Sequence, residues 1–327
     1  MIGLLRRVVR AWLPARRPVV LMYHRVASAE YDPWDLAVSP VRFDEQLAEL
    51  RREREVLPLP EFGSLLARGR LPARAAAITF DDGYACNALV AAPILRAHRL
   101  PATFFLTTGA IGTDREFWWD ELARLVVETQ APVQASVVVR GRRFGVDLAV
   151  PPVPDAALKR WAGLSPSEEP RIQTYQKLWT ALRPLPHAEQ RALLDSIWAA
   201  CGLSPRARTS HRAMTRDEAH GLNVCGLFHI APHTISHPAL GGLPEVEQRR
   251  EIVGSRAACL GLGCNVAALF AYPYGDLTPL TARIVRDAGF TAACTTRPGP
   301  VERRCSPFEI PRIQAIERPV SRGAGGR

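Results

Sequence analysis

The sequence has no Cys-x-x-Cys pair, and its seven cysteines are an odd number for a set of disulfides. Several stand inside apolar runs, where reduced cysteines commonly pack. A chain of 327 residues is also long enough to bury a core without covalent cross-links. We therefore expect free thiols and a reducing, cytoplasmic environment. The cysteines are at positions 86, 201, 225, 259, 264, 294 and 305.

An uninterrupted apolar run is missing from the N-terminus. Residues 1–17 place Leu4, Val8 and Trp12 on one helical face and arginines elsewhere, which predicts a basic amphipathic helix. Its apolar run is too short to cross a membrane and too interrupted for a signal-peptide core. Such a helix can rest on an anionic membrane surface, at the inner face, or dock on its own domain. Both interpretations remain open.

Nucleic-acid recognition motifs are absent as well. The net charge is +10 and the pI is about 9.7, but the arginines are scattered and form no aromatic-basic platform. We expect no nucleic-acid partner, because an anionic membrane or a lipid-pyrophosphate-linked glycan explains the charge as well. Residues 317–327 are expected to form a flexible tail.

The sequence does contain two adjacent carboxylates at the end of an apolar run. Residues 75–78 predict a buried strand, followed closely by Asp81, Asp82 and Gly83, and the glycine permits a sharp exit. Side chains alternate along a strand, so the two carboxylates should diverge. One can then bind a cation while the other handles a proton. An ordinary Asp-Asp-Gly turn is the alternative.

A second motif places two histidines four positions apart, His233 and His237. Histidines at this spacing can face one metal ion from a single helical turn. Pro232 and Pro238 bracket the segment, which favours a short turn or loop. The glutamate of the His-Glu-x-x-His zinc proteases is missing. Alone, such a pair is more often incidental than metal-binding.

A third motif, Tyr272-Pro273-Tyr274-Gly275, follows another apolar run. The order Thr-Phe-Asp-Asp-Gly, then His-Thr-x-x-His, then Tyr-Pro-Tyr-Gly resembles the polysaccharide deacetylases of carbohydrate esterase family four. The resemblance covers about Val19 to Arg312, apart from a poorly matched middle region. It implies an α/β fold, a distorted and incomplete (β/α) barrel with catalytic residues at the C-terminal strand ends.

The first two motifs carry the family's metal site. By resemblance, Asp81 matches the general base. Asp82, His233 and His237 match the triad that holds one divalent ion, most often zinc and sometimes cobalt or nickel. Thr234 matches the residue that braces the metal loop.

The third motif matches the family's oxyanion loop. Tyr274 corresponds to the residue whose backbone N–H helps to bind the oxyanion, and Tyr272 and Pro273 are expected beside it as substrate contacts. Many members carry an arginine two residues before the proline, where it orients the base. This sequence has Ala271 there, so the brace for the base must come from elsewhere.

The family's C-terminal Leu-x-His motif, which supplies a general acid, is also absent, since no histidine follows His237. The candidate substitute is His24, directly after the apolar run Val19–Tyr23. Exopolysaccharide-type members resemble this arrangement, with a Tyr-His strand at the N-terminus. Among the eight histidines, only His24 is expected at the C-terminal end of a buried strand. A satisfied core histidine is the alternative.

The resemblance implies hydrolysis of an N-acetyl group. A metal with an open position lowers the pKa of its bound water to about 7. Asp81 would take the water proton, and the metal and the Tyr274 amide would stabilise the oxyanion. His24 would protonate the leaving amine. Tyr23 and Tyr272 are candidates for stacking on sugar rings, with core packing as the alternative.

The pattern around these motifs alternates apolar runs with amphipathic stretches, as in an α/β fold. Helices are predicted over residues 39–55, with Ser39 as N-cap, over 85–98, and after a capping box that opens at Thr215. The strand candidates are residues 19–22, 75–79, 102–107, 227–231, 267–272 and 291–295.

Residues 115–212 break this alternation and predict an insertion in a deacetylase barrel that spans 18–316. The insertion should contain a hairpin around 137–144 and two helices, 171–182 and 187–201. Trp118 and Trp119 are candidates to line a glycan groove, although burial beneath the insertion is favoured.

Together these features predict a metal-dependent hydrolase that removes N-acetyl groups from amino sugars of a polysaccharide, oligosaccharide or lipid-linked glycan. One alternative is a carbohydrate-binding pseudoenzyme, favoured by Ala271 and the missing C-terminal histidine. The other is an amidohydrolase that acts on a non-sugar amide.

Overall fold

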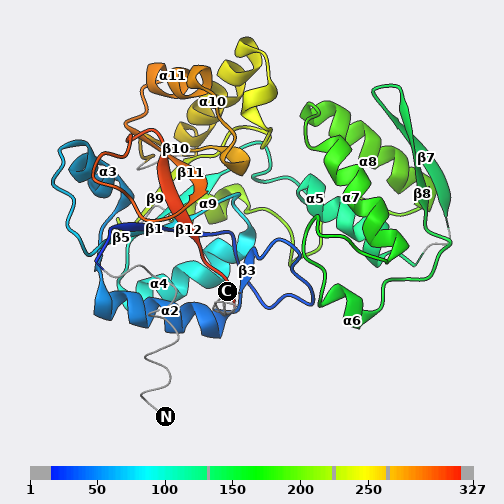
Figure 1. Ribbon diagram of the computed structural model, residues 1–327, viewed down its shortest axis with the longest axis horizontal. Helices are drawn as coiled ribbons and strands as arrows, with labels where there is room; N and C mark the ends of the chain where they lie inside the picture. Colours follow the sequence, from blue (N-terminus) through cyan, green and yellow to red (C-terminus); the bar gives the residue numbers. More distant parts are fainter. Residues whose placement is uncertain (1–15, 131–132, 223–225, 263–265, 318–327) are drawn as a thin grey trace, which may run out of the picture.

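The core of the computed structural model is a sheet of eight parallel strands that curls into an incomplete barrel (Figure 1). Residues 16–130, 133–222, 226–262 and 266–317 are described. The strand order is β10-β11-β12-β1-β5-β6-β9, and the short β4 pairs with β5. The strands are β1 (Val19–Tyr23), β4 (Glu55–Val56), β5 (Ala75–Phe80), β6 (Ala102–Leu106), β9 (Phe228–Pro232), β10 (Leu269–Ala271), β11 (Ala292–Pro298) and β12 (Ile310–Gln314).

The two ends of this sheet approach each other, so the barrel is nearly closed. Ile230 of β9 forms a parallel bridge with Val266, just before β10. The Ala267 N–H donates a hydrogen bond to the Ile230 carbonyl at 2.9 Å. The predicted distorted, incomplete (β/α) barrel is therefore confirmed.

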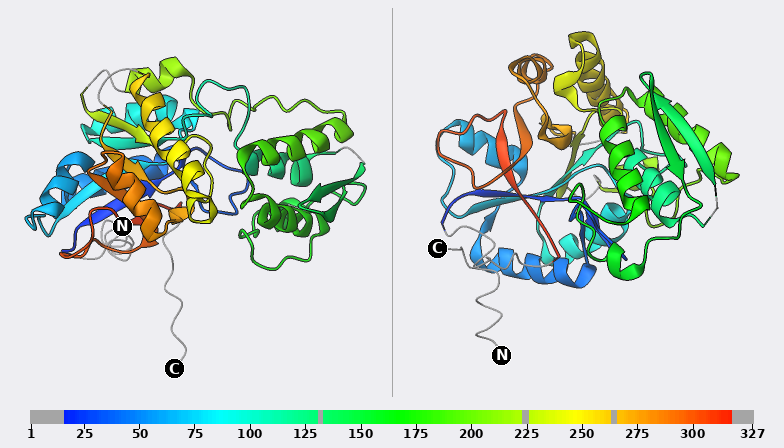
Figure 2. Two further views of the ribbon diagram at one scale, coloured as in Figure 1. Left: turned by 90° about the horizontal axis from the view of Figure 1, so that it is seen from above. Right: turned by 45° about the vertical axis from the view of Figure 1, so that its right-hand side comes forward.

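Helices cover the outside of the barrel (Figure 2), and their ends are set by local sequence signals. The Ser39 hydroxyl caps α2 by accepting a hydrogen bond from the Arg42 N–H at 3.3 Å. The predicted capping box opens α9, where Thr215 and Glu218 exchange two side chain–backbone hydrogen bonds. These helices are α2 (Pro40–Glu53), α3 (Leu59–Ala67), α4 (Ala92–His98), α9 (Arg216–Leu222), α10 (Glu245–Leu260) and α11 (Pro279–Asp287).

The predicted strands all form, with ends within three residues of those expected. The sequence pattern does not predict β12, because Pro311 and Arg312 interrupt its apolar residues. The predicted helix over residues 85–98 begins instead with a π-helical stretch, Asn87–Ala91, that continues into α4. A small extra pair, β2 (Arg25–Val26) and β3 (Ala37–Val38), lies after β1.

Residues 115–212 form a lobe beside the barrel, seen at the right of Figure 1. The chain enters and leaves it side by side, through bridges between Arg115 and Arg206 and between Glu116 and Arg212. The predicted hairpin and both predicted helices are present. The lobe contains α5 (Trp118–Ala123), β7 (Gln134–Val139), β8 (Arg142–Asp147), α6 (Asp155–Leu158), α7 (Pro170–Leu182) and α8 (His187–Cys201).

A buried carboxylate ties this lobe together at its base. Glu121 is fully buried and accepts two hydrogen bonds from Arg115, at 2.7 and 2.8 Å, and one from Arg191 at 3.0 Å. Such a network is strong only when each charge is paired, as here. Trp118 and Trp119, on the same helix, are 3% and 7% exposed. Both are buried, as favoured, and Trp119 also contributes to the wall of a pocket.

Residues 1–15 of the predicted N-terminal helix (1–17) and residues 318–327 of the predicted tail (317–327) lie outside the described residues. Within the described part, no helix combines the length and the apolar character needed to cross a bilayer. Five of the seven cysteines are described, and all five are free thiols.

Candidate active site

The C-terminal ends of several strands meet at one pocket of about 350 Å³. The loops after β1, β5, β9 and β10 each supply one or more of the residues singled out in the sequence. The pocket is lined by Met22, His24, Trp34, Leu36, Asp81, Asp82, Trp119, Trp179, Arg183, His233, His237, Tyr274, Thr296 and Gln314. The end of the barrel at which these residues gather is the one where (β/α) barrels place their active sites.

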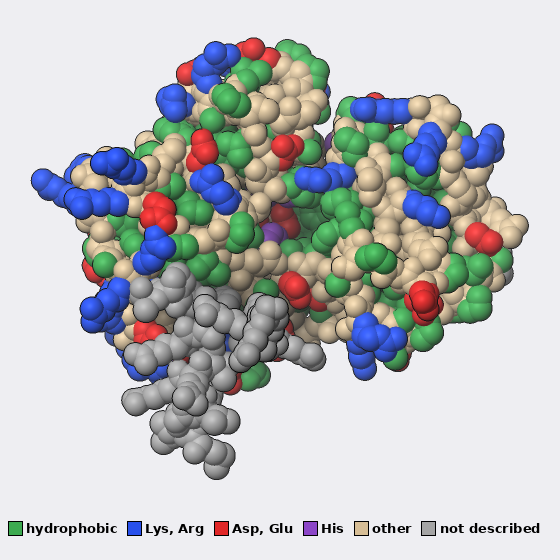
Figure 3. Space-filling view, viewed as in Figure 1, with side chains coloured by type: hydrophobic (Ala, Val, Ile, Leu, Met, Phe, Trp, Pro, Cys, Tyr) green, Lys and Arg blue, Asp and Glu red, His purple; other side chains and the backbone are tan. Residues whose placement is uncertain are grey.

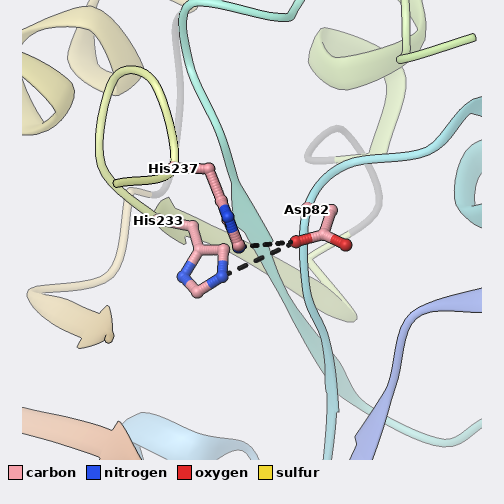
Figure 4. A group of neighbouring side chains, drawn as sticks. All are labelled: Asp82, His233 and His237. Carbon is pink, nitrogen blue, oxygen red and sulfur yellow. Dashed lines mark ion pairs between the residues drawn. The ribbon is translucent and has the colours of Figure 1, made fainter. Parts of the chain in front are cut away.

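Asp82, His233 and His237 point toward one another in this pocket (Figure 4). Asp82 Oδ1 lies 3.3 Å from His237 Nε2 and 3.7 Å from His233 Nε2. One ligand atom from each residue lies within 4.8 Å of the others. Burial alone would raise the pKa of Asp82, but the two histidines, led by His237, hold it below its ordinary value.

These three residues fit a divalent cation. Among the described residues Asp82 Oδ1 is buried without a hydrogen-bond partner, which is costly unless a further group pairs with it. Two imidazole nitrogens and one carboxylate oxygen are a typical three-ligand set for zinc, with a position left for water or substrate. The predicted metal ligands therefore come together in one place.

The surrounding loop fixes the direction of both imidazoles. His233 Nδ1 donates a hydrogen bond to the Ala271 carbonyl at 2.7 Å, which leaves Nε2 facing Asp82. Burial lowers the pKa of His233 to about 4, so the ring is neutral, as a metal ligand must be. Thr234 Oγ1 accepts a hydrogen bond from the His237 N–H at 2.9 Å. Thr234 thus braces the loop at the position that the resemblance implied.

Glu251 of α10 also holds this loop, and sequence reasoning missed it. Its carboxylate accepts hydrogen bonds from the backbone N–H groups of Ile235 and Ser236, at 2.8 and 2.9 Å. It accepts a third from the Ser236 hydroxyl at 2.8 Å. The carboxylate is buried and so satisfies donors that would otherwise be unpaired.

The backbone is strained at four positions around the pocket. Asp82, Thr234, His237 and Tyr274 have φ values of 72°, 66°, 61° and 58°. Non-glycine residues adopt this left-handed conformation at a cost of about 1–3 kcal/mol each, and such residues cluster at functional sites. Three of the four are the candidate metal ligands Asp82 and His237 and the residue Tyr274 of the predicted oxyanion loop, so the strain lies where the chemistry is predicted.

Asp81 is held by an arginine that the sequence did not identify. Arg312 Nη1 and Nη2 donate hydrogen bonds to the two Asp81 oxygens at 2.7 and 2.6 Å. Arg312 is fully buried, and its other donors reach the Thr295 carbonyl and the Thr79 hydroxyl. Burial by itself would raise the pKa of Asp81, but the Arg312 guanidinium outweighs it and holds the pKa well below the ordinary value.

His24 lies in the same pocket, at the end of β1. Along this strand Met22 and His24 face the pocket, whereas Tyr23 faces the other way. His24 is close enough to contribute, after larger causes, to the lowered pKa of both Asp81 and Asp82. Its Nδ1 is buried with no hydrogen-bond partner among the described residues.

The oxyanion loop places only Tyr274 in the pocket. The centre of its ring lies 4.6 Å from the centre of the His237 ring, and its carbonyl accepts a hydrogen bond from the Thr296 hydroxyl. Tyr272 and Pro273 are buried and do not line the pocket. The Tyr272 ring instead contacts Phe270 in the core.

Stacking of Tyr272 or Tyr23 on a sugar ring is therefore excluded. Tyr23 is 1% exposed, its ring stacks on Phe80, and its hydroxyl donates to Gln46 of α2 at 3.0 Å. The Tyr272 hydroxyl donates to the Phe308 carbonyl at 3.1 Å. In both cases the core-packing alternative is correct, because both side chains are buried and neither lines the pocket.

The insertion contributes part of the pocket wall; Trp119 was a candidate from the sequence for such a position, whereas Trp179 and Arg183 were not. The Trp119 ring lies 4.8 Å from the His237 ring, centre to centre, although Trp119 is almost fully buried. Trp179 and Arg183, at the end of α7, also line the pocket. Trp34, from the segment after β1, stacks on Trp179 at 4.7 Å. Trp179 lies on the buried face of α7, and the helical pattern alone does not show that this face meets the pocket.

Comparison with known proteins agrees with this geometry. A model of the polysaccharide deacetylase family matches residues 68–134 and 207–293, and the unmatched stretch between them is most of the insertion. The poly-beta-1,6-N-acetyl-D-glucosamine N-deacetylase of Staphylococcus aureus is 30% identical over 109 residues. That match spans 29% of this chain and 38% of the relative, so the chain covers well under half of the curated relative's length.

Solved structures share the fold over nearly the whole chain. IcaB from Ammonifex degensii has a TM-score of 0.58 and 19% sequence identity, with 92% of this chain and 93% of that chain covered. Streptococcus pyogenes deacetylase PplD, solved in complex with acetate, has a TM-score of 0.55 and 18% identity, with 93% and 94% covered. At these identities the likeness establishes the fold.

Proposed function

We propose that the chain is a polysaccharide deacetylase, a metal-dependent hydrolase that removes N-acetyl groups from amino sugars of a glycan. The family model that matches residues 68–134 and 207–293 and the partial similarity to a curated N-deacetylase support this proposal. The observation that carries the proposal is the pairing of two differently held carboxylates. Asp82 faces two histidines and is left free to bind a cation, whereas Asp81 is bound by Arg312 and stays ionised.

Asp82, His233 and His237 would hold the cation. When bound, a divalent ion supplies Lewis acidity and a water of lowered pKa. The metal content is proposed as one ion per chain, with zinc favoured by the two imidazoles and one carboxylate, and cobalt or nickel as alternatives.

Asp81 is proposed as the general base that removes a proton from the attacking water. Its carboxylate Oδ2 lies 3.9 Å from His233 Nε2, so it is beside the cation site without being one of the three closest ligands. Arg312 fixes the orientation of this carboxylate through two parallel hydrogen bonds. A base held in one rotamer loses less entropy when the reaction begins.

His24 is proposed as the general acid that protonates the departing amine. It lines the same pocket as Asp81 but comes from β1, so the two groups can act on different parts of the acetamide. The backbone of the Tyr274 loop is proposed to bind the carbonyl oxygen as charge develops there. The products are acetate and a free amino sugar.

The test is acetate release from N-acetylglucosamine oligomers. Purified protein is incubated with β-1,4- and β-1,6-linked oligomers, and acetate and free amino groups are quantified in the same samples. We expect the two products in equal amounts, loss of both after chelation, and recovery on adding zinc. Oligomer binding without acetate release would favour the carbohydrate-binding pseudoenzyme. Release only from non-sugar amides would favour the amidohydrolase.

The cellular location is also a proposal. The five free thiols agree with a reducing compartment, and we propose a cytoplasmic enzyme that meets its glycan at the inner membrane face. Fractionation of cells that express the full chain, followed by a salt wash of the membranes, tests this location.

A further inference from the structure

Arg183, at the end of α7 in the insertion, reaches the wall of the candidate active site. It lines both the metal pocket and an adjoining groove of about 1280 Å³ between the insertion and the barrel. Figure 3 shows the hollow between the two lobes, with histidine and acidic side chains visible inside it. One side chain of the insertion therefore belongs to both spaces.

The guanidinium of Arg183 is held by aromatic rings. Its central carbon lies 4.6 Å from the centre of the Tyr274 ring and 5.4 Å from that of the Trp179 ring. The Tyr274 ring is in turn 4.6 Å from the ring of the metal ligand His237. Cation–π contacts of this kind orient a guanidinium without neutralising it. The positive charge is thus fixed one ring away from the metal site.

This charge has no carboxylate partner in the described part of the chain. No ion pair and no side-chain hydrogen bond there involves the Arg183 guanidinium, and its Nε is buried without an acceptor. Arg312, the other arginine near the site, is bound to Asp81 instead. A guanidinium without an ion-pair partner can bind an oxyanion, because its planar N–H groups can donate two parallel hydrogen bonds to it.

The acidic groups around the groove are already engaged. Glu247 forms an ion pair with Arg250 at 2.9 Å. Glu251 binds the metal loop through three hydrogen bonds, and Asp276 accepts one from the Gly241 N–H at 3.2 Å. None of them lies within ion-pair distance of Arg183, so the anion that completes this site must come with a ligand.

We propose that Arg183 recognises an oxyanion, a carboxylate or a phosphoryl group, on the glycan whose acetamide enters the metal pocket. The inference rests on the proposed function and adds its substrate class, an acidic N-acetylated glycan. The groove exceeds the roughly 300–1,000 Å³ of an ordinary small-ligand pocket, so it has room for sugars that flank the reacting one. Arg183 and its neighbour Trp179 line this groove from the insertion, so the insertion becomes a determinant of specificity.

The test compares matched N-acetylated oligosaccharides of one length: a neutral one, one with uronic acid carboxylates, and one with a phosphate ester. We expect the wild-type protein to have a lower KM for one of the acidic oligosaccharides than for the neutral one. The oligosaccharide with the lowest KM then identifies the anion as a carboxylate or a phosphate. Arg183→Gln should raise that KM on the order of 10- to 100-fold, as for a lost hydrogen bond to a charged group. The KM for the neutral oligomer should change little. Arg183→Lys should recover part of the preference.

The matched control is Arg249→Gln, which removes an exposed arginine that pairs with Glu245 on α10. It should leave the acidic-to-neutral KM ratio unchanged. An equal loss on neutral and acidic substrates in Arg183→Gln would show that Arg183 only supports Tyr274, and it would overturn the proposal. Absence of any acidic preference in the wild type would overturn it as well.

Binding separates a failure of this inference from a failure of the proposed function. Calorimetry on the Asp81→Asn protein measures affinity for the same three oligosaccharides without turnover. Tighter binding of an acidic oligomer, lost on adding Arg183→Gln, supports the anion site even if the wild type releases no acetate. Equal affinities for all three overturn the anion site even if acetate is released.

Discussion

Arg312 and Asp81 form a bidentate ion pair, with hydrogen bonds of 2.7 and 2.6 Å, although 231 positions separate them in the chain. Both side chains are buried. The arginine comes from β12, a strand whose neighbours in the sheet are β11 and β1. Arg312 therefore orients the proposed base, a role that Ala271 at the family's usual arginine position cannot fill.

Removing Arg312 should destabilise the protein and inactivate it. Arg312→Met leaves the Asp81 carboxylate buried without its partner, which typically costs about 3–5 kcal/mol. Urea denaturation of the variant and the wild type measures this loss, and acetate release measures activity. The double variant Arg312→Met with Asp81→Leu should regain much of the stability, because no unpaired charge remains. Equal stabilities of the wild type and Arg312→Met would contradict this account.

Metal binding should depend on His237. His237→Ala removes one of three ligands, so we expect metal content after dialysis to fall from one ion per chain to a small fraction of that. His229→Ala is the matched control, since His229 lies within β9 and does not line the pocket. Elemental analysis of both variants checks the prediction. Full retention of the ion in His237→Ala would place the metal elsewhere.

The two adjacent aspartates should fail in different ways. Asp81→Asn should keep the metal but reduce kcat on the order of 10²–10⁴-fold, because the base is lost while the ligand set stays intact. Asp82→Asn should lose the metal first and activity as a consequence. Metal analysis and acetate release on the same preparations separate the two results. Ordinary turnover in both variants would rule out the assigned roles.

His24→Ala should leave metal content nearly unchanged and lower kcat on the order of 10²–10⁴-fold, as for a missing general acid. The basic limb of its pH–rate profile should also flatten. His98→Ala is a suitable control, because His98 lies at the end of α4 and contacts Asp44 at 2.8 Å, outside the pocket. An unaltered kcat in His24→Ala would mean that another group protonates the amine.

Asp120 should make stability depend on pH. Burial raises its pKa to about 7, against partial compensation from Arg25 and from the Tyr84 hydroxyl, which donates to it at 2.7 Å. The folded protein therefore keeps a proton that the unfolded chain releases above about pH 4. The contribution of Asp120 to the free energy of unfolding is therefore fully present below about pH 4. It is lost as the pH rises toward 7.

The measurement is the difference in unfolding free energy between wild type and Asp120→Asn, at pH 5 and pH 7.5. Asparagine keeps the acceptor for Tyr84 but does not titrate. From pH 5 to pH 7.5, the free energy of unfolding of the wild type should fall by on the order of 2 kcal/mol relative to that of the variant. A constant difference would show that Asp120 is ionised throughout.

The sequence by itself predicted most of the local elements and the residues of the candidate metal site. Apolar runs that end in Asp81-Asp82 and Pro232-His233 are strands followed by ligands, because burial and turn chemistry are local properties. The capping box at Thr215 and the helices of the insertion follow from short-range patterns in the same way. The resemblance to the deacetylase motifs predicted that Asp82, His233 and His237 come together, although a long stretch of chain separates Asp82 from His233.

The tertiary structure alone decided which side chains complete the site. Alternation along β1 puts Tyr23 and His24 on opposite sides, but only the closure of the barrel makes one side the pocket and the other the core. Arg312 became the partner of Asp81 because β12 lies beside β1 in the sheet, and no local pattern encodes that neighbour. Arg183 reached Tyr274 because the insertion folds against the barrel mouth. These contacts are long-range, so their energies depend on the packing of the whole chain rather than on the residues adjacent in sequence.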